Sequence, residues 1–130
     1  VVLDVAHNAQ AVDTFVATLR TLPAVPRTHV VLGMLNTKDR ASAMGALAAI
    51  ADAWYLATVQ AAKGASADEL HATWRELPAR ASASCHPSVA AAFEAARDAA
   101  VAGERIVAIG SFITVGEVLR LVAADERQAR

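Results

Sequence analysis

Apolar residues are arranged in two ways along this chain, and the two arrangements alternate. Short runs rich in β-branched residues predict strands, at about residues 1–5, 29–34, 53–59, 81–85 and 105–109. Longer stretches with apolar residues three or four positions apart predict helices, at about residues 9–22, 39–52, 66–77, 87–102 and 114–124. The polar tail, residues 125–130, is expected to fray.

The predicted strands are apolar on both faces, which is typical of a mainly parallel sheet covered by helices on both sides. The sequence therefore predicts an α/β fold with a Rossmann-like, doubly wound sheet. Trp54 and Tyr55, placed here in the third strand, also fit the end of the preceding helix. Ligands of such sheets bind at the carboxyl ends of the strands, so the loops that follow the strands are where chemistry is expected.

Composition limits the class of protein. The 130 residues fit one domain. Lys and Arg (12) nearly balance Asp and Glu (13), which argues against nucleic-acid or membrane partners. Cys85 is the single cysteine and is expected in the core; because it cannot form an internal disulfide, it agrees with a cytoplasmic location. Val1 lies inside a predicted strand with no initiator Met, which predicts a domain cut from a larger protein.

The end of the first strand holds the most informative polar residues. Asp4 interrupts an apolar run, and a carboxylate removed from water needs a partner. It either accepts the hydroxyls of a nucleotide ribose, as acidic residues do in other nucleotide sites, or binds loop amides. Asn8 fits a helix cap, and His7 fits either a loop histidine or a group facing the cleft.

The order and spacing of several segments resemble those of a known family over essentially the whole chain. These segments are Leu3-Asp4-Val5-Ala6-His7-Asn8, Gly33-Met34-Leu35 with Lys38-Asp39, Trp54-Tyr55, and Gly110-Ser111-Phe112 with Thr114-Val115. They are similar to the C-terminal domain of bacterial bifunctional dihydrofolate/folylpolyglutamate synthases. The first segment is shared with the wider Mur ligase superfamily, and the later segments favour the folate branch. Two positions depart from the family: Ala9 replaces the usual Pro, and Ile113 stands where His is common.

The resemblance implies an ATP-dependent amide ligase. Such an enzyme phosphorylates the carboxylate of dihydropteroate, or of the terminal glutamate of a folate, and the amine of L-glutamate attacks the acyl phosphate. Residues 1–130 would then be one C-terminal domain, inactive alone. The resemblance places the phosphate-binding loop and the ligands of Mg²⁺ in a preceding central domain that is missing here, and this chain has no Gly-x-x-x-x-Gly-Lys-Ser/Thr sequence to replace that loop. The domain would close over ATP and exclude water, in a protein expected to be a monomer.

The resemblance also implies roles for three residues. Asp4 would bind the ATP ribose, His7 would face the reacting groups as the catalytic residue, and Ser111 would help hold glutamate. Ser111 precedes a helix whose free amides suit a carboxylate, although a plain helix cap is the alternative. Asp39 fits a helix cap and Lys38 a solvated charge.

Two other functions remain open at this point. One is a Mur-type ligase that adds an amino acid to a peptidoglycan precursor on the same fold. The other is a non-catalytic α/β module that binds a nucleotide. The remaining histidines lack partners at zinc-ligand spacing, so no metal site is expected within this domain.

Overall fold

The computed structural model describes residues 1–36, 39–78 and 81–128. Within them, strands and helices alternate. The strands are β1 (Val2–Asp4), β2 (Thr28–Leu32), β3 (Ala53–Ala57), β4 (Ser82–His86) and β5 (Arg105–Ile109). The helices are α1 (Ala9–Leu19), α2 (Arg40–Leu47), α3 (Ala67–Arg75), α4 (Val89–Ala99) and α5 (Phe112–Gln128).

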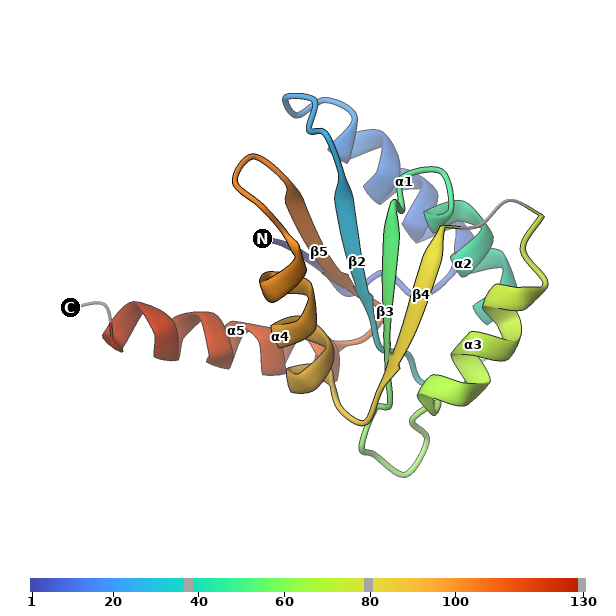
Figure 1. Cartoon of the computed structure of the whole chain (residues 1–130). Helices are drawn as coiled ribbons and strands as arrows, with labels where there is room; N and C mark the ends of the chain where they lie inside the picture. The colour runs from blue at the N-terminus through green and yellow to red at the C-terminus, as the bar shows by residue number, and fades with distance from the viewer. Residues whose placement is uncertain (37–38, 79–80, 129–130) are drawn as a thin grey trace.

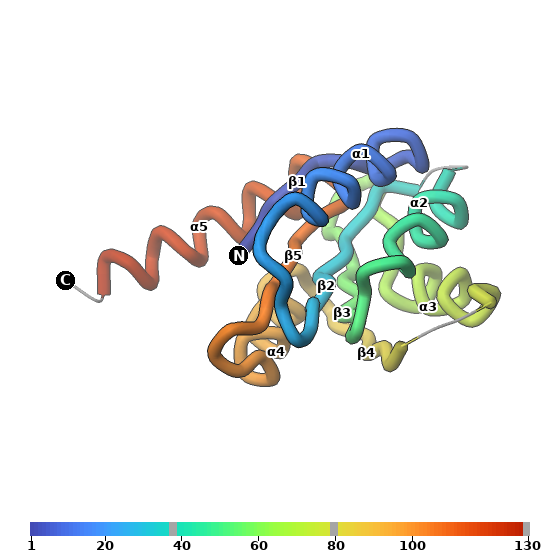
Figure 2. Tube along the Cα trace, turned by 90° about the horizontal axis from the view of Figure 1, so that it is seen from above, coloured from blue at the N-terminus to red at the C-terminus, as the bar shows by residue number. Residues whose placement is uncertain are grey.

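All strand pairs are parallel, in the order β1-β5-β2-β3-β4 (Figure 1). Every residue of β2 and β3 is buried, because helices cover the sheet on both faces. One core lies under α1, α2 and α3, and a second lies under α4 and α5. Figure 2 shows α4 opposite the first three helices and α5 extending away from the sheet. The predicted α/β fold with a parallel sheet is confirmed.

Local sequence explains most element ends. Ser66 caps α3 by accepting the amide of Glu69 at 3.1 Å, and Glu69 bonds back to the Ser66 amide, so the predicted capping box is confirmed. Ser88 caps α4 in the same way, accepting the Ala91 amide. Trp54 and Tyr55 lie in β3, as predicted, and are buried.

Several boundaries and one burial prediction are wrong. The first two helices end early, at Leu19 and Leu47, because their last predicted residues form turns. The helix predicted to reach residue 102 ends at Ala99, because Ala100 is extended. The last helix is longer than predicted at both ends, and residues 125–128 are helical instead of frayed, because Asp125 pairs with Arg97 of α4. Cys85 is exposed because it lies on the edge strand β4.

None of the helices in the described residues has the length and apolar character needed to cross a membrane.

Candidate functional site

The carboxyl ends of β1, β5 and β2 meet at one edge of the sheet. Asp4 is in register with Ile109, and Ile109 is in register with Leu32, so three strands end side by side. The turn from β1 to α1 carries His7, and the turn from β5 to α5 carries Ser111. The residues predicted from the sequence to act together therefore lie on two neighbouring turns.

Asp4 is half-buried and one of its oxygens is already used. Its Oδ1 accepts the backbone amide of Ala6 at 2.7 Å, which fixes the start of the turn. Within residues 1–36, 39–78 and 81–128, Oδ2 accepts no hydrogen bond, and Asp4 lines an open depression along α1 with Asn8 and Gln10. Both interpretations of Asp4 thus find support, because one oxygen binds a loop amide and the other is left for a ligand.

His7 is exposed and Asn8 is a helix cap. The Nδ1 atom of His7 lies 3.2 Å from the carbonyl oxygen of Val5. A proton on Nδ1 donates to that carbonyl and leaves the Nε2 lone pair facing outward. Asn8 accepts the Ala11 amide at 2.9 Å through its side chain, so its predicted capping role is confirmed.

The hydroxyl of Ser111 is buried and takes part in a closed set of hydrogen bonds. It accepts the amide of Thr114 at 3.1 Å and lies 2.9 Å from Thr114 Oγ1. Thr114 Oγ1 donates to the carbonyl oxygen of Gly33 at 2.8 Å, so the single proton between the two hydroxyls comes from Ser111. Ser111 therefore has the contacts of a helix cap and no proton left for a carboxylate.

The first turn of α5 still offers donors to a ligand. In the part of the chain that the structure describes, the amides of Phe112 and Ile113 donate no hydrogen bond. The first amides of a helix have no partner within it and carry partial positive charge, which suits a carboxylate. The first turn of α5 thus has two amides without a partner among the described residues, and the Ser111 side chain caps this turn.

Two glycines allow the turns to approach closely. Gly110 has φ +125°, and a Cβ on it would lie 2.3 Å from the carbonyl oxygen of Gly33. A Cβ on Gly33 would lie 2.6 Å from Thr114 Oγ1. Side chains at either position would therefore push apart the ends of β2 and β5.

The predicted site residues divide between two depressions. His7 and Ser111 line one small hollow of about 100 Å³ together with Val5, Leu35 and Phe112. Asp4 lines the other depression, along α1. The two depressions share no lining residue, a feature that the sequence did not predict.

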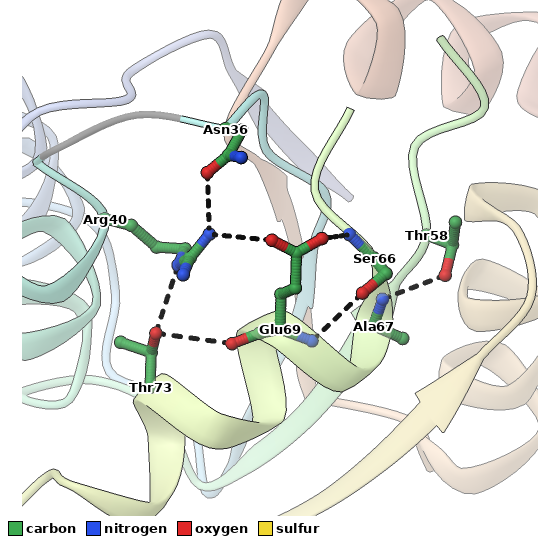
Figure 3. A network of polar contacts seen from close by, with 7 residues as sticks. All are labelled: Asn36, Arg40, Thr58, Ser66, Ala67, Glu69 and Thr73. Atoms are coloured by element: carbon green, nitrogen blue, oxygen red, sulfur yellow. Dashed lines mark hydrogen bonds and ion pairs between the residues drawn. The ribbon is translucent and has the colours of Figure 1, made fainter. Parts of the chain in front are cut away.

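A polar network lies beside this edge and was missed by the sequence analysis. Arg40 donates to Asn36 at 3.2 Å and to Thr73 at 3.0 Å, and its guanidinium lies 3.8 Å from a carboxylate oxygen of Glu69 (Figure 3). The hydrogen bond from the Ser66 amide is the main reason that the pKa of Glu69 is lowered. The network ties the start of α2 to α3, so Arg40 serves the fold.

The structure adds little about Asp39 and Lys38, the two other polar residues singled out in the sequence before α2. Asp39 occupies the N-cap position of α2, but its side chain makes no capping hydrogen bond, so the predicted cap is wrong in that respect. Lys38 lies outside the described residues. No group of three or more His, Cys, Asp and Glu side chains that could hold a metal ion is found among residues 1–36, 39–78 and 81–128.

Comparison with known proteins identifies the family. Residues 1–112 match the model of the family described as "Mur ligase, glutamate ligase domain", and the chain belongs to this family. It is 34% identical over 124 residues to the dihydrofolate synthase/folylpolyglutamate synthase of Escherichia coli K12, which covers 95% of this chain and 28% of the relative. The predicted resemblance to the folate branch is confirmed.

Solved structures agree with this assignment. Escherichia coli FolC in complex with DHPP and ADP is 32% identical, with a TM-score of 0.85 over 95% of this chain and 28% of that one. A bifunctional folylpolyglutamate synthase/dihydrofolate synthase with Mn, AMPPNP and L-glutamate bound is 30% identical, with a TM-score of 0.80 over 93% of this chain and 29% of that one. The chain thus spans less than a third of the length of these relatives.

Proposed function

We propose that this chain is the C-terminal domain of an ATP-dependent amide ligase that adds L-glutamate to dihydropteroate or to a folate. The observation that carries the proposal is the edge where β1, β5 and β2 end, with an unused Asp4 oxygen and unpaired amides on adjacent turns. The names of the relatives support it, because they are synthases bound to ADP or AMPPNP, to DHPP, and to Mn and L-glutamate.

Asp4 is assigned to the nucleotide. Its free oxygen accepts the hydroxyls of the ATP ribose, while Oδ1 keeps its bond to the Ala6 amide and so keeps the carboxylate oriented. ATP supplies the phosphoryl group that activates the acceptor carboxylate. A divalent ion such as Mg²⁺ is assigned to the central domain.

His7 and the start of α5 are assigned to the second substrate. The amides of Phe112 and Ile113 bind a carboxylate of L-glutamate, and Ser111 helps by holding this turn in place. His7, on the facing turn, lies beside the amine as it attacks the acyl phosphate and accepts or relays its proton through Nε2. Closure of the domain keeps water from the acyl phosphate.

The Mur-type alternative has the same fold and reaction and differs in the acceptor. A non-catalytic module would add an amino acid neither to a pterin-containing acceptor nor to a peptidoglycan precursor. We further assign the parent protein to the cytoplasm as a monomer; within this chain the single cysteine, Cys85, cannot form an internal disulfide.

The test uses the full-length parent protein, with ATP, L-glutamate and either dihydropteroate, a folate or a peptidoglycan precursor as acceptor. Wild type should form ADP in proportion to glutamate added, and only with the pterin-containing acceptors. Asp4→Asn should raise KM for ATP about 10- to 100-fold, because a charge-assisted hydrogen bond is lost. His7→Ala should lower kcat with KM for ATP unchanged.

The matched control for Asp4→Asn is Asp13→Asn, which makes the same chemical change on the exposed face of α1. It should leave the kinetics at wild-type values. An Asp4→Asn enzyme with unaltered KM for ATP would remove the ribose role, and ligation to a peptidoglycan precursor alone would favour the Mur-type alternative.

A further inference from the structure

Phe112 is the most exposed large apolar side chain of the candidate site. Its side chain is 79% exposed, and Leu35, across the same hollow, is 40% exposed. An aromatic ring left in water beside a ligand site is an unused binding surface. Neither the fold nor the three roles already assigned uses it.

The position of Phe112 is fixed although its ring is free. Ser111 and Thr114 hold the first turn of α5 to the carbonyl oxygen of Gly33, and Gly110 lies so near Gly33 that a Cβ on it would be 2.3 Å from that oxygen. A rigid backbone that presents an exposed aromatic ring lowers the ordering entropy lost when a ligand binds. The buried hydroxyls thus act as positioning groups for Phe112.

The side chains of the hollow offer an apolar surface next to the amides assigned to glutamate. Among its described lining residues, His7 is the one titratable side chain, Val5, Leu35 and Phe112 are apolar, and Gly110 and Ser111 complete the lining. Phosphate and carboxylate groups need cations or amides, so the side chains of Phe112 and Leu35 match an uncharged part of a ligand.

Two aromatic groups belong to the proposed substrates: the adenine of ATP and the ring system of the acceptor. Adenine goes with the ribose, and Asp4 lines the other depression. The acceptor is the substrate whose reacting carboxylate must approach His7. In dihydropteroate that carboxylate is attached directly to a benzene ring.

We infer that Phe112 and Leu35 form an apolar wall that contacts the benzoyl ring of the acceptor when the domain closes, and that Phe112 thereby selects acceptors by the distance between ring and carboxylate. This inference rests on the proposed function. Each glutamate added to a folate moves the reacting carboxylate further from the ring, so the contact weakens as the chain lengthens. Short acceptors gain most from Phe112.

The experiment compares the full-length wild type with Phe112→Ala on a series of acceptors: dihydropteroate, folate with one glutamate, and folate with three. KM for dihydropteroate should rise about tenfold in Phe112→Ala. The rise should be smaller for the monoglutamate and absent for the triglutamate, with KM for ATP unchanged. Phe112→Tyr, which retains the ring, should bring KM for dihydropteroate back toward the wild-type value.

The control is Val101→Ala, which removes a 66% exposed apolar side chain from the loop before β5, at the opposite edge of the sheet. It should change none of these constants. An equal loss of activity on all three acceptors, or a higher KM for ATP, would show that Phe112 packs against the preceding domain and would overturn the inference. A wild-type enzyme that ligates glutamate to no pterin acceptor would refute the proposed function itself. An active wild type, together with a Phe112→Ala enzyme that loses activity equally on all three acceptors, would refute the inference alone.

Discussion

The strands of the sheet begin along an amino-terminal edge and end along a carboxyl-terminal edge, and these two edges use polar side chains in opposite ways. At the amino-terminal edge, His29 lies between two partners: its Nδ1 is 2.9 Å from the hydroxyl of Tyr55 and its Nε2 is 2.8 Å from a carboxylate oxygen of Glu104. Glu104 also accepts the Val101 amide at 3.1 Å. His29 is 1% exposed, so this network is closed.

At the carboxyl-terminal edge, Asp4 and His7 each make one hydrogen bond with their own turn and keep a second atom open to solvent. In the described part of the chain, no buried side-chain nitrogen or oxygen lacks a partner, so the unused groups of the molecule are on its surface. A polar network that satisfies itself stabilises the fold, whereas Asp4 and His7 keep atoms available, as the proposed ligand roles require. Both edges carry a histidine, and its surroundings are the basis for proposing different roles.

The largest expected effect concerns the two glycines with positive φ, one at each edge. Gly103, before β5, has φ +89° with nothing within 4 Å of a Cβ, while Gly110, after β5, has φ +125° and a Cβ would overlap Gly33. Gly103→Ala should lower the free energy of unfolding by about 1–2 kcal/mol through backbone strain alone. Gly110→Ala should lower it by more than about 3 kcal/mol, because overlap adds to strain.

Urea unfolding of the two variants followed by circular dichroism gives the comparison. Gly45→Ala, inside α2 with open space around it, is the control and should raise stability by about 0.5–1 kcal/mol. Equal losses for Gly103→Ala and Gly110→Ala would mean that the turns at the carboxyl-terminal edge are not clamped.

The next effect comes from making the same substitution, His to Leu, at each of the two histidines. His29→Leu should lower the free energy of unfolding by about 1–3 kcal/mol, because the buried hydroxyl of Tyr55 loses its partner. The folded full-length enzyme should keep its wild-type kcat. His7→Leu, at an exposed position, should change stability by less than about 0.5 kcal/mol and lower kcat. A stable but inactive His29→Leu enzyme would contradict the assignment of the two edges.

The sequence predicted the fold well where the determining contacts are local. The alternating pattern placed every strand, with β5 correct at both ends, because apolar periodicity and turn residues act within a few positions. The capping box at Ser66 was predicted for the same reason. The end of α5 was missed because it depends on Asp125 pairing with Arg97, which belongs to another helix.

The candidate site was predicted in part. Asp4, His7 and Ser111 lie at the predicted edge, since strand ends of a parallel sheet meet there. The use of the Ser111 proton depends on Gly33, 81 residues before Thr114, and the His29 network joins residues 75 positions apart. No local pattern encodes such contacts, and the separation of Asp4 from His7 into two depressions depends on the same tertiary packing.

The smallest expected effect is a change in acid stability. The hydrogen bond from His29 is the main cause that lowers the pKa of Glu104 from its ordinary value of 4.5. The unfolded chain therefore binds a proton at a higher pH than the folded chain. The stabilisation from Glu104 is present above about pH 4.5 and is lost as the pH falls through the lower, folded-state pKa.

Glu104→Gln removes this titration, so stability should depend less steeply on pH below 4.5 than in wild type. Unfolding midpoints measured in urea from pH 3 to pH 7 check the slope. Glu126→Gln changes the same charge at an exposed position of α5 and should follow the wild-type curve. Because Glu104 meets His29 only in the folded chain, a Glu104→Gln curve parallel to wild type at every pH would mean that the pair does not form. The amino-terminal edge would then be as open as the carboxyl-terminal one.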